Sequence, residues 1–392
     1  MAVPSPVVIV GGGFGGLSTA LQLAQQPNHP PVLLIEPQER FLFLPLLYEL
    51  LSDELSRWQI APRYEDLLAG QGIAWLRDRV CTIDTGSASL RTEGGRELHY
   101  SQLVIASGGR PESFGIPGVE QHALGFRNLA DVERLQQLVQ TLRQRRRPLQ
   151  RLVVVGAGAT GVELACKLAD LLEGSAVIEL VEQGVELLPT SKAFNREQAR
   201  LALQRRDIRL RTGTRVVAVQ ADGLELSRST GTNGSERLQA DGVVWAAGVA
   251  GCVPPISPPL ALDRRGRLLC NADLSVVGLS HVFALGDAAS CPGEETSSAA
   301  AYPATAQVAY QQAERLAANL LLTRAGEPLQ PFVWNDLGEM LGLGIGQATI
   351  TGMGLTLAGP GAYQMRRLAY LARLPGLSQK LKVAAGWLAA WR

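Results

Sequence analysis

Two segments of the sequence share one pattern of hydrophobic and polar positions. The first opens with the apolar run Val7–Val10, continues through a helix-like segment at Leu17–Gln26, and closes with the apolar run Val32–Ile35. The second has apolar runs at Leu152–Val155 and Val177–Val181, with a helical pattern between them. Because short apolar runs are typical of buried strands, each segment predicts a strand–helix–strand unit. We therefore expect an α/β fold with parallel sheets and two Rossmann-like dinucleotide-binding domains.

Both units carry glycines between the first strand and the helix, with the spacing G-x-G-x-x-G. These glycines are Gly11, Gly13 and Gly16 in the first unit, and Gly156, Gly158 and Gly161 in the second. The first permits a tight turn, the second lets a pyrophosphate approach the backbone, and the third lets helix and strand pack closely. The helix N-terminus then faces the phosphates. The candidate contacts in the first turn also include Gly12, Phe14 and Gly15.

An acidic residue ends the second strand of each unit. Glu36 and Glu182 each follow the last glycine of their unit by about twenty residues, the distance at which a carboxylate bonds to ribose hydroxyls. Glu182 favours NADH, because a 2′-phosphate would be repelled there and the following Gln183–Gly184 supplies no arginine. Two fingerprints indicate two dinucleotides, one held permanently and one exchanged. This combination is expected of an enzyme in which a nicotinamide dinucleotide reduces a bound flavin.

Further candidate residues lie where predicted strands end in small residues. Open α/β sheets bind ligands at the carboxyl edge of their strands. The strand at Leu103–Gly108, the strand at Val243–Val249 and the segment His281–Ala288 all end in this way. Asp287 is interpreted as a ligand for ribityl hydroxyls, the alternative being a helix N-cap. The cofactor candidates from these strand ends are Ser107, Gly108, Ala247, Gly248, Gly286 and Asp287.

Three other segments carry candidate chemistry. The apolar segment Phe41–Leu51 is interrupted by Pro45 and should bend into a helix, forming a wall against a flat ring or simply core. Gln307 and Gln311 share one helical face, which suits a carbonyl-bearing substrate unless they are only solvated. Glu163 is placed on the first turn of the second helix, either favouring the helix N-terminus or contacting the nicotinamide side of the pocket.

Composition narrows the class of protein. The 392 residues are 46% hydrophobic with 42 glycines, as in a globular α/β protein, and the net charge of +1 gives no case for a nucleic-acid partner. The five cysteines form no C-x-x-C or metal pattern, so no metal is expected. We find no secretory signal and no transmembrane run, which indicates a reducing, cytosolic-type compartment.

The C-terminal region differs from the rest of the chain. Two basic, apolar helices are predicted at about Tyr363–Leu374 and Leu377–Trp391. In the second, an apolar face lies opposite Lys382, as in helices that lie in a membrane interface. The alternative is packing on the protein's own core or on a second subunit, which would make a homodimer. The apolar face consists of Leu377, Leu381, Ala384, Leu388 and Trp391.

With these elements placed, the chain resembles the type II NAD(P)H:quinone oxidoreductases, flavoprotein reductases with a glutathione-reductase-like fold. The residues that carry this resemblance lie at Ala157–Ala165, Val243–Val249 and Ala306–Gln312. The segments Leu47–Ser52 and Ile60–Arg63 look most like the demethylphylloquinone reductase branch of phototrophs and plastids. That branch reduces prenylated naphthoquinones in phylloquinone (vitamin K1) biosynthesis, and also plastoquinone-type benzoquinones. Some members use NADPH, so the dinucleotide stays open.

The resemblance implies a mechanism and a set of roles. FAD would lie along Gly11–Gly16, with NAD(P)H on Gly156–Gly161, and hydride would pass from NAD(P)H to the flavin. A quinone would enter from the membrane side near Gln307 and Gln311 and take two electrons, with Glu163 coupling proton transfer. The enzyme would lie on the cytoplasmic side of a thylakoid or plasma membrane. Further flavin candidates are Glu36, Pro45, Val80, Ser107, Asp287 and Ala304.

The predicted domains are a discontinuous FAD-binding domain, an NAD(P)H-binding domain and a C-terminal membrane-associating region, at 1–115 with 265–325, at 116–264 and at 326–392. Two other functions stay open. A sulfide:quinone oxidoreductase shares this fold and needs a cysteine pair at the flavin, for which Cys166 and Cys291 are candidates. A non-enzymatic redox sensor would bind NAD(P)H and change partners.

Overall fold

A computed structural model describes residues 5–145, 147, 149–228, 235–293 and 302–390, with side chains up to residue 387. The chain divides into two compact units. The first unit comprises residues 1–42, 61–110 and 249–335, and the second comprises residues 43–60, 111–248 and 336–392. Each unit contains one of the two fingerprints.

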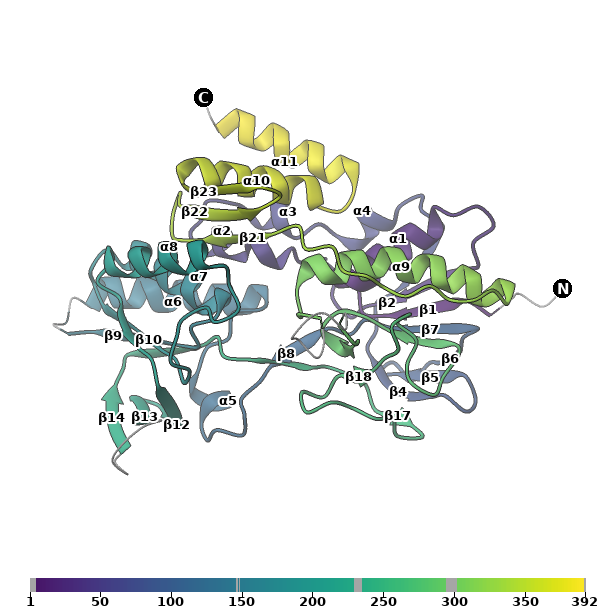
Figure 1. The fold of residues 1–392 in the computed structure, drawn as a ribbon, viewed down its shortest axis with the longest axis horizontal. Coiled ribbons are helices and arrows are strands. Elements are labelled where there is room, and N and C mark those ends of the chain that lie inside the picture. The colour runs from purple at the N-terminus through teal and green to yellow at the C-terminus, as the bar shows by residue number, and fades with distance from the viewer. Residues whose placement is uncertain (1–4, 146, 148, 229–234, 294–301, 391–392) are drawn as a thin grey trace. The chain divides into compact units, whose positions relative to one another are not determined.

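The first unit is built on a five-stranded parallel sheet in the order β19-β7-β1-β2-β3. All residues of β1 and β7 are buried, as their apolar runs predict. The helices α1 and α9 lie side by side (Figure 1). The sheet and these helices are β1 (Val7–Val10), α1 (Phe14–Ala24), β2 (Val32–Ile35), β3 (Ile73–Leu76), β7 (Gln102–Ile105), β19 (Val282–Ala284) and α9 (Ala306–Ala325).

Smaller elements complete the first unit. A four-stranded sheet has the order β17-β4-β5-β6, and β18 pairs with β20. These elements are α4 (Tyr64–Leu68), β4 (Val80–Asp84), β5 (Ser89–Thr92), β6 (Glu97–His99), β8 (Gly109–Pro111), β16 (Val249–Gly251), β17 (Ile256–Ser257), β18 (Leu268–Leu269), η2 (Gly286–Ala288) and β20 (Ala289–Ser290). The last residue of β8, Pro111, belongs to the second unit.

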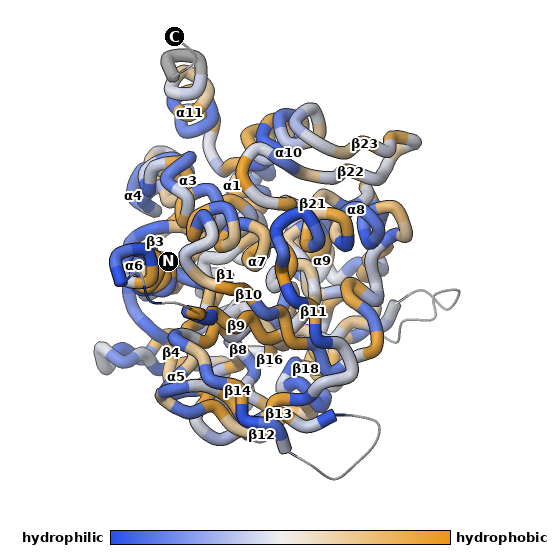
Figure 2. Tube along the Cα trace, turned by 90° about the vertical axis from the view of Figure 1, so that its left-hand side faces the viewer, coloured by the Kyte–Doolittle hydropathy of each residue, from blue (hydrophilic) through white to orange (hydrophobic). Residues whose placement is uncertain are grey.

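The second unit repeats the parallel arrangement with a sheet in the order β11-β10-β9-β15. Hydrophobic residues concentrate in strands such as β9 and β10 (Figure 2), and they form one core with the antiparallel sheet β12-β13-β14. The elements are α5 (Val119–His122), α6 (Leu129–Arg145), β9 (Arg151–Val155), α7 (Ala159–Leu172), β10 (Val177–Val181), α8 (Ala193–Gln204), β11 (Arg209–Arg211), β12 (Thr214–Gln220), β13 (Gly223–Arg228), β14 (Ser235–Gln239) and β15 (Gly242–Trp245).

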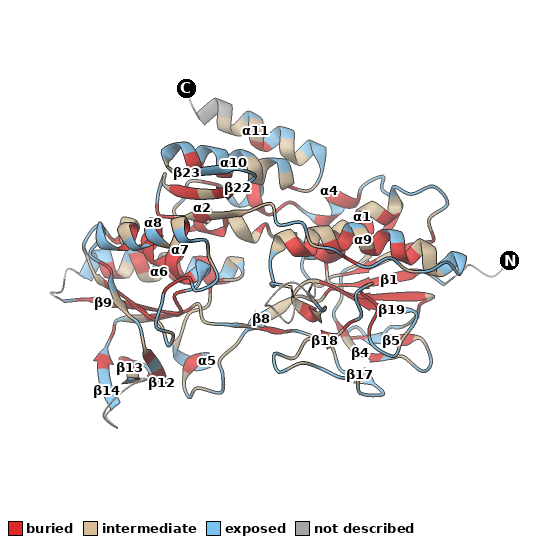
Figure 3. Ribbon diagram, viewed as in Figure 1, coloured by how far each residue is buried: buried red, intermediate tan, exposed pale blue. Residues whose placement is uncertain are grey.

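Residues 43–60 and 336–390 pack within the second unit rather than apart from it. Pro45 opens a short 3-10 helix that leads directly into α2, which confirms the predicted bend. In Figure 3, α7 is largely buried, whereas α10 and α11 expose much of their surface. These elements are η1 (Leu44–Leu46), α2 (Leu47–Leu51), α3 (Arg57–Ile60), β21 (Glu339–Gly342), β22 (Ala348–Gly352), β23 (Leu355–Gly359), α10 (Pro360–Arg373) and α11 (Leu377–Ala390).

The predicted α/β fold with parallel sheets is therefore confirmed. The predicted start of the first helix at Leu17 is wrong, because α1 already begins at Phe14. A helix that starts inside the glycine turn brings its unpaired N–H groups to the turn itself. The placement of Glu163 on the first turn of the second helix is also wrong. Because α7 begins at Ala159, Glu163 lies in its second turn.

Candidate functional site

The glycine turn of the first unit is built by close backbone contacts. Gly11 has a φ of +99°, and a Cβ there would lie 2.4 Å from the Ala106 carbonyl oxygen. A Cβ on Gly16 would lie only 1.9 Å from the Gly11 carbonyl oxygen. Gly13 differs, because a Cβ at this position would meet no described atom within 4 Å. The turn is therefore tight on the protein side and open at Gly13, where a ligand would approach.

Glu36 is held at the end of β2 by two backbone donors. Its Oε2 accepts from Gly12 N–H at 2.7 Å, and its Oε1 accepts from Gln38 N–H at 2.8 Å. Burial raises the pKa of Glu36, and these N–H groups offset only part of the rise. The Tyr64 hydroxyl donates to the Gly12 carbonyl oxygen at 2.7 Å. Sequence reasoning missed Tyr64, because no local pattern links it to the turn.

The strand ends of β7 and β19 add polar groups in the same unit. Ser107 Oγ is buried and has no hydrogen-bond partner among the described residues, which fits a site shaped for a polar ligand. Asp287 Oδ2 lies 3.0 Å from where a Cβ on Gly109 would sit, so the carboxylate reaches from η2 to the start of β8. Gln312, buried on α9, accepts from Gly286 N–H at 2.8 Å and so fixes η2.

The other candidates from the sequence lie as follows. Val80 begins β4 and is 7% exposed. Ala304 is exposed and lies just before α9. Pro45 opens η1 in the second unit, where its carbonyl oxygen accepts from Arg366 at 3.0 Å. Their assignment to a cofactor stays a prediction.

The glycine turn of the second unit follows the same plan. Gly156 has a φ of +100°, and a Cβ on Gly161 would lie 1.8 Å from its carbonyl oxygen. The carboxylate of Glu182 accepts from Ala157 N–H and from Gly184 N–H, both at 2.7 Å. It is therefore held beside the turn, as Glu36 is in the first unit.

The end of β15 closes one side of this second turn. A Cβ on Gly156 would lie 2.9 Å from the Cα of Ala247. A Cβ on Gly248 would lie 2.5 Å from the Phe114 ring. The structure thus brings Ala247 to the glycine turn, with Gly248 packed under an aromatic side chain that sequence reasoning did not single out. As with Gly156, Gly158 and Gly161, nucleotide binding here stays a prediction.

Glu163 belongs to a buried cluster of charged groups in the second unit. Its Oε1 accepts from Gly342 N–H at 2.6 Å and lies 3.5 Å from the Arg366 guanidinium. Arg366 also pairs with Glu49, and both side chains are only 1% exposed. The Glu163 side chain itself is 12% exposed.

Charge balance explains the protonation of this cluster. Burial raises the pKa of Glu163, and Arg366 and Gly342 N–H offset only part of that rise. The pKa of Arg366 stays well above its ordinary value despite burial, because Glu49 lies beside it. We conclude that Arg366 balances the carboxylate of Glu49, while Glu163 holds a proton more readily than a solvated glutamic acid. Sequence reasoning missed Glu49 and Arg366, which lie far apart in the chain.

The glutamines of α9 are bound by the segment that follows the helix. Trp334 Nε1–H donates to Gln307 Oε1 at 3.1 Å. Gln311 donates to the Asn335 carbonyl oxygen and accepts from Asn335 N–H, both at 2.9 Å. Neither side chain is simply solvated, so both amides have fixed orientations. Their role toward a substrate stays a prediction.

The two cysteines considered as a pair at the flavin, Cys166 and Cys291, are buried. Cys166 lies within α7, where burial raises the pKa of its thiol to about 12. Cys291 lies against Cys270, and their mutual contact together with burial raises the pKa of Cys270 far above that of a free thiol. Among the described residues, no cluster of acidic, histidine or cysteine side chains could hold a metal ion.

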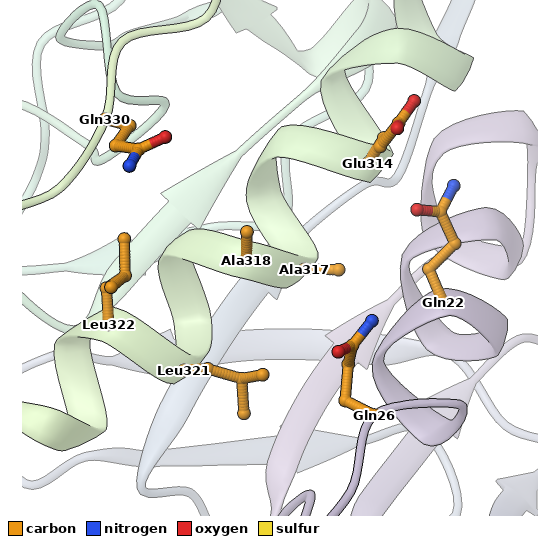
Figure 4. Close-up of a pocket in the computed structure, with 8 residues that line it drawn as sticks. All are labelled: Gln22, Gln26, Glu314, Ala317, Ala318, Leu321, Leu322 and Gln330. Atoms are coloured by element: carbon orange, nitrogen blue, oxygen red, sulfur yellow. The ribbon is translucent and has the colours of Figure 1, made fainter.

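A groove of about 460 Å³ lies between α1 and α9 (Figure 4). Gln22 and Gln26 line it from α1, and Glu314, Ala317 and Leu321 line it from α9. It contains none of the residues predicted to carry chemistry. We therefore do not assign the reaction to it.

The two C-terminal helices are partly confirmed as amphipathic. Leu377 and Leu381 on α11 are 71% and 62% exposed, whereas Val383 is buried. The predicted Trp391 lies outside the described residues, and the side chain of Leu388 is not described. Of the helices in the described part of the chain, none is long and apolar enough to cross a bilayer.

Comparison with known proteins places the chain in a family. Residues 5–313 match the model for the pyridine nucleotide-disulphide oxidoreductases. The demethylphylloquinone reductase NdbB of Synechocystis sp. is 39% identical over 97% of this chain and 95% of its own length. An alternative NAD(P)H-ubiquinone oxidoreductase C1, chloroplastic/mitochondrial, of Arabidopsis thaliana is 34% identical over 98% and 80%.

Fold similarity extends to a solved structure of NDH2 from Plasmodium falciparum in complex with NADH. It aligns with a TM-score of 0.85 and 18% identity over 98% of this chain and 97% of that one. This likeness shows a common fold, and the sequence relatives show the activity. The chain belongs to the type II NAD(P)H:quinone oxidoreductases and is an NAD(P)H:quinone oxidoreductase flavoenzyme.

Proposed function

We propose that this enzyme reduces a prenylated naphthoquinone of the demethylphylloquinone type. The observation that carries this proposal is the 39% identity, over nearly the whole length of both chains, to a demethylphylloquinone reductase. The relative at 34% identity is named for ubiquinone, a benzoquinone, so a plastoquinone-type benzoquinone is the second candidate substrate. Both quinones expose two carbonyl oxygens that require two electrons and two protons.

FAD fits the glycine turn of the first unit. Gly13 leaves room for a pyrophosphate, and Glu36 is held where it can accept from ribose hydroxyls. Ser107 Oγ and Asp287 offer polar groups at the ends of neighbouring parallel strands. When bound, FAD would supply the two-electron chemistry that no side chain provides. Gly12, Phe14 and Gly15 complete the turn, and Val80 and Ala304 are further proposed contacts.

NAD(P)H is proposed to exchange on the second turn, at Gly156, Gly158 and Gly161. Glu182 favours NADH, because its carboxylate would bond to a free 2′-hydroxyl and repel a 2′-phosphate. Ala247 and Gly248 would flank the nicotinamide side, since they follow the strand β15 beside this turn. The proposed domains follow this division, with FAD on 1–115 and 265–325, and NAD(P)H on 116–264.

Glu163 is proposed to supply a proton to the quinone. It combines a raised pKa with partial exposure, so it holds a proton more readily than a solvated glutamic acid does and can release it to a strong base. A quinone that has taken a hydride equivalent is such a base. Gln307 and Gln311 are proposed to meet the quinone carbonyls, because an amide nitrogen has two hydrogens and Gln311 uses one on Asn335.

Membrane association is proposed through the exposed apolar side chains of α10 and α11. Leu368 is 61% exposed, and it adds to the exposed Leu377 and Leu381 on α11. Lys380 flanks this apolar face and Lys382 lies opposite it, as in helices that bind anionic bilayers. Arg366 on the same α10 is fully buried, so α10 is fixed to the protein while its outer face stays available. A homodimer stays a prediction.

Liposome co-sedimentation tests the membrane proposal. The variant Leu377→Ser/Leu381→Ser should bind vesicles with anionic lipid at least about tenfold more weakly, because each buried leucine contributes roughly 1.5–3 kcal/mol. Leu149→Ser is the matched control, since Leu149 is 85% exposed outside these helices. Equal binding of both variants would contradict the proposal.

Stopped-flow absorbance tests the reaction. The flavin of the purified enzyme should bleach with NADH faster than with NADPH and recover when a prenylated naphthoquinone is added. Recovery with plastoquinone alone would move the substrate to the benzoquinones. Bleaching by sulfide but not by NADH would favour the sulfide:quinone oxidoreductase, and bleaching without recovery would favour a sensor.

A further inference from the structure

Phe114 is an aromatic residue that the fold leaves open to solvent. All eight phenylalanines lie in the described part of the chain, and Phe114 alone among them is exposed, at 57%. It lies in the segment between β8 and α5, within the second unit. Its φ of +54° places the backbone in the left-handed region, which bulky residues rarely adopt. Backbone strain of this kind clusters at functional sites, so we ask what the ring could bind.

Hydrogen bonds hold this strained segment against the end of β15. The Glu112 carboxylate accepts from Phe114 N–H at 2.9 Å. The backbone of Glu112 is itself fixed, because its N–H donates to the Gly248 carbonyl oxygen at 3.3 Å. Its carbonyl oxygen accepts from Trp245 Nε1–H at 2.8 Å, and Trp245 is the buried last residue of β15. The protein therefore sets the position of Phe114 through Glu112.

The ring of Phe114 meets the backbone at Gly248. A Cβ on Gly248 would lie 2.5 Å from Cζ and 2.9 Å from Cε2 of the ring. Any side chain at position 248 would therefore displace the ring. The preceding residue, Ala247, is the one whose Cα lies 2.9 Å from where a Cβ on Gly156 would sit. The exposed ring thus lies one residue away from the contact that closes the second glycine turn.

The order of the strands shows which half of a dinucleotide would reach this ring. In the parallel sheet β11-β10-β9-β15, the glycine turn follows β9, Glu182 follows β10, and Gly248 follows β15. The acid and the ring therefore lie on opposite sides of the turn. A dinucleotide with its pyrophosphate on the turn and its adenosine ribose on Glu182 would extend its other half towards β15. That other half carries the nicotinamide.

We propose that the Phe114 ring is a platform on which the nicotinamide ring of NAD(P)H stacks, and that Glu112 holds this platform in place. Nicotinamide is a flat aromatic ring, and hydride leaves it from one face only. The other face is free to lie on a phenyl ring, an arrangement that aromatic pairs favour. A platform fixed before the ligand binds loses little conformational entropy on binding. This inference rests on the proposed binding of NAD(P)H to the second glycine turn.

Two pairs of variants separate the platform from its support. Phe114→Ala removes the ring, whereas Phe114→Leu keeps an apolar side chain that cannot stack. Glu112→Ala removes the acceptor of Phe114 N–H, whereas Glu112→Gln keeps an oxygen acceptor without the charge. Leu149→Ala is the matched control, because Leu149 is also an exposed apolar residue of the second unit, at 85%, with a φ of +64°.

The measurement compares two ligands by anaerobic calorimetry on the flavin-loaded enzyme, reduced beforehand so that no hydride moves. One ligand is NADH, and the other is ADP-ribose, which lacks only the nicotinamide. The ratio of the Kd for ADP-ribose to the Kd for NADH reports the contribution of the nicotinamide ring. We expect this ratio to fall about fivefold or more in Phe114→Ala and Phe114→Leu, the scale of one stacked base. It should fall about threefold in Glu112→Ala, the scale of half a hydrogen bond to a charged group.

The ratio should stay within about twofold of the unmodified enzyme in Leu149→Ala and Glu112→Gln, because neither change touches the ring or its support. An unchanged ratio in Phe114→Ala would overturn the platform, even if both ligands bound more weakly, since a merely structural role weakens both alike. An unchanged ratio in Phe114→Leu would overturn stacking. An unchanged ratio in Glu112→Ala would overturn the support by Glu112.

Glu182→Gln separates this inference from the proposed function. Both ligands carry the adenosine ribose, so Glu182→Gln should weaken NADH and ADP-ribose alike and leave their ratio unchanged. If it weakened neither ligand, the second turn would not be the NAD(P)H site, and the platform would fall with that site. If it weakened both while Phe114→Ala kept the normal ratio, the site would stand and only the platform would be overturned.

Discussion

The two glycine turns are alike in backbone but differ in what covers them. In both, a glutamate at the end of the second strand accepts from two N–H groups at 2.7–2.8 Å. The first turn is covered by Tyr64, whose hydroxyl binds the Gly12 carbonyl oxygen and lies 2.5 Å from where a Cβ on Gly12 would sit. The corresponding residue in the second turn is Ala157, which carries a methyl group there.

The helices that follow the two turns also differ in the side chains that they place beside the turn. In α1, Phe14 packs between Phe41 and Tyr310, with ring centroids 5.3 Å away in both pairs. In α7, the first turn carries the exposed Thr160, and the next turn carries Glu163. One turn is therefore flanked by aromatic side chains, and the other by an exposed hydroxyl group and a partly exposed carboxyl group. This difference is what a permanently held flavin and an exchanging nicotinamide would each require.

The largest effect is expected from a methyl group on the last glycine of either turn. Gly16→Ala places a Cβ 1.9 Å from the Gly11 carbonyl oxygen, and Gly161→Ala places one 1.8 Å from that of Gly156. Each should lower the free energy of unfolding of its unit by about 3 kcal/mol or more. We expect Gly16→Ala to lose flavin and Gly161→Ala to keep it but not be reduced by NADH. Flavin absorbance measures the bound flavin, and thermal unfolding measures the stability. Loss of flavin from both variants would contradict the assignment of the flavin to the first turn alone.

A smaller, ligand-specific effect is expected at the middle glycines. A Cβ on Gly13 or Gly158 meets no described atom within 4 Å, so each alanine variant should unfold within about 1 kcal/mol of the unmodified enzyme. The methyl group would instead meet a pyrophosphate. Gly13→Ala should purify with less flavin, and Gly158→Ala should raise the KM for NADH with normal flavin content. Normal flavin content in Gly13→Ala and a normal KM for NADH in Gly158→Ala would show that the dinucleotides bind elsewhere.

The sequence predicted what is local and missed what is brought together by tertiary structure. The strands, the glycine turns, Glu36 and Glu182 lie within about thirty residues of one another in each unit, so spacing alone relates them. Tyr64, Arg366 and Glu49 reach their partners from distant segments, and nothing in their neighbourhood marks them. The misplaced Glu163 has a different cause: the pattern of residues does not fix the first residue of a helix. An error of a few residues at a helix start moves a side chain by one turn.

Tyr64→Phe tests whether the cover of the first turn holds the flavin. It removes the hydroxyl that donates to the Gly12 carbonyl oxygen and keeps the ring against Trp75, 5.6 Å away. One buried hydrogen bond contributes about 1 kcal/mol, so flavin release should become about fivefold faster. Dilution into a flavin scavenger measures the rate. Tyr100→Phe serves as the control, because it removes the hydroxyl of another buried tyrosine of the first unit. An equal change of the flavin release rate in both variants would show that the Tyr64 hydroxyl has no specific role in holding the flavin.

The smallest effect expected is a pH dependence of stability from Glu163, the acid that the second helix carries and the first does not. Burial raises the pKa of Glu163 in the folded protein above the ordinary value of 4.5, so the folded state binds its proton more tightly than the unfolded state does. The stabilisation is complete below about pH 4.5 and is lost as the pH rises through the raised pKa. Relative to the unmodified enzyme, Glu163→Gln should therefore gain stability as the pH rises.

The matching acid for this pH experiment is Glu54, also in the second unit, where Lys167 lowers the pKa of its carboxyl group although burial opposes this. Glu54→Gln should therefore lose stability relative to the unmodified enzyme as the pH rises through the lowered pKa towards about 4.5, and the difference should stay constant at higher pH. Melting temperatures should diverge from those of the unmodified enzyme by about 2–4 °C per kcal/mol, above about pH 4.5 for Glu163→Gln and below it for Glu54→Gln, with opposite signs for the two variants. The same sign in both would show that Arg366 stabilises the charged form of Glu163 more than burial opposes it, and that Glu163 stores no proton.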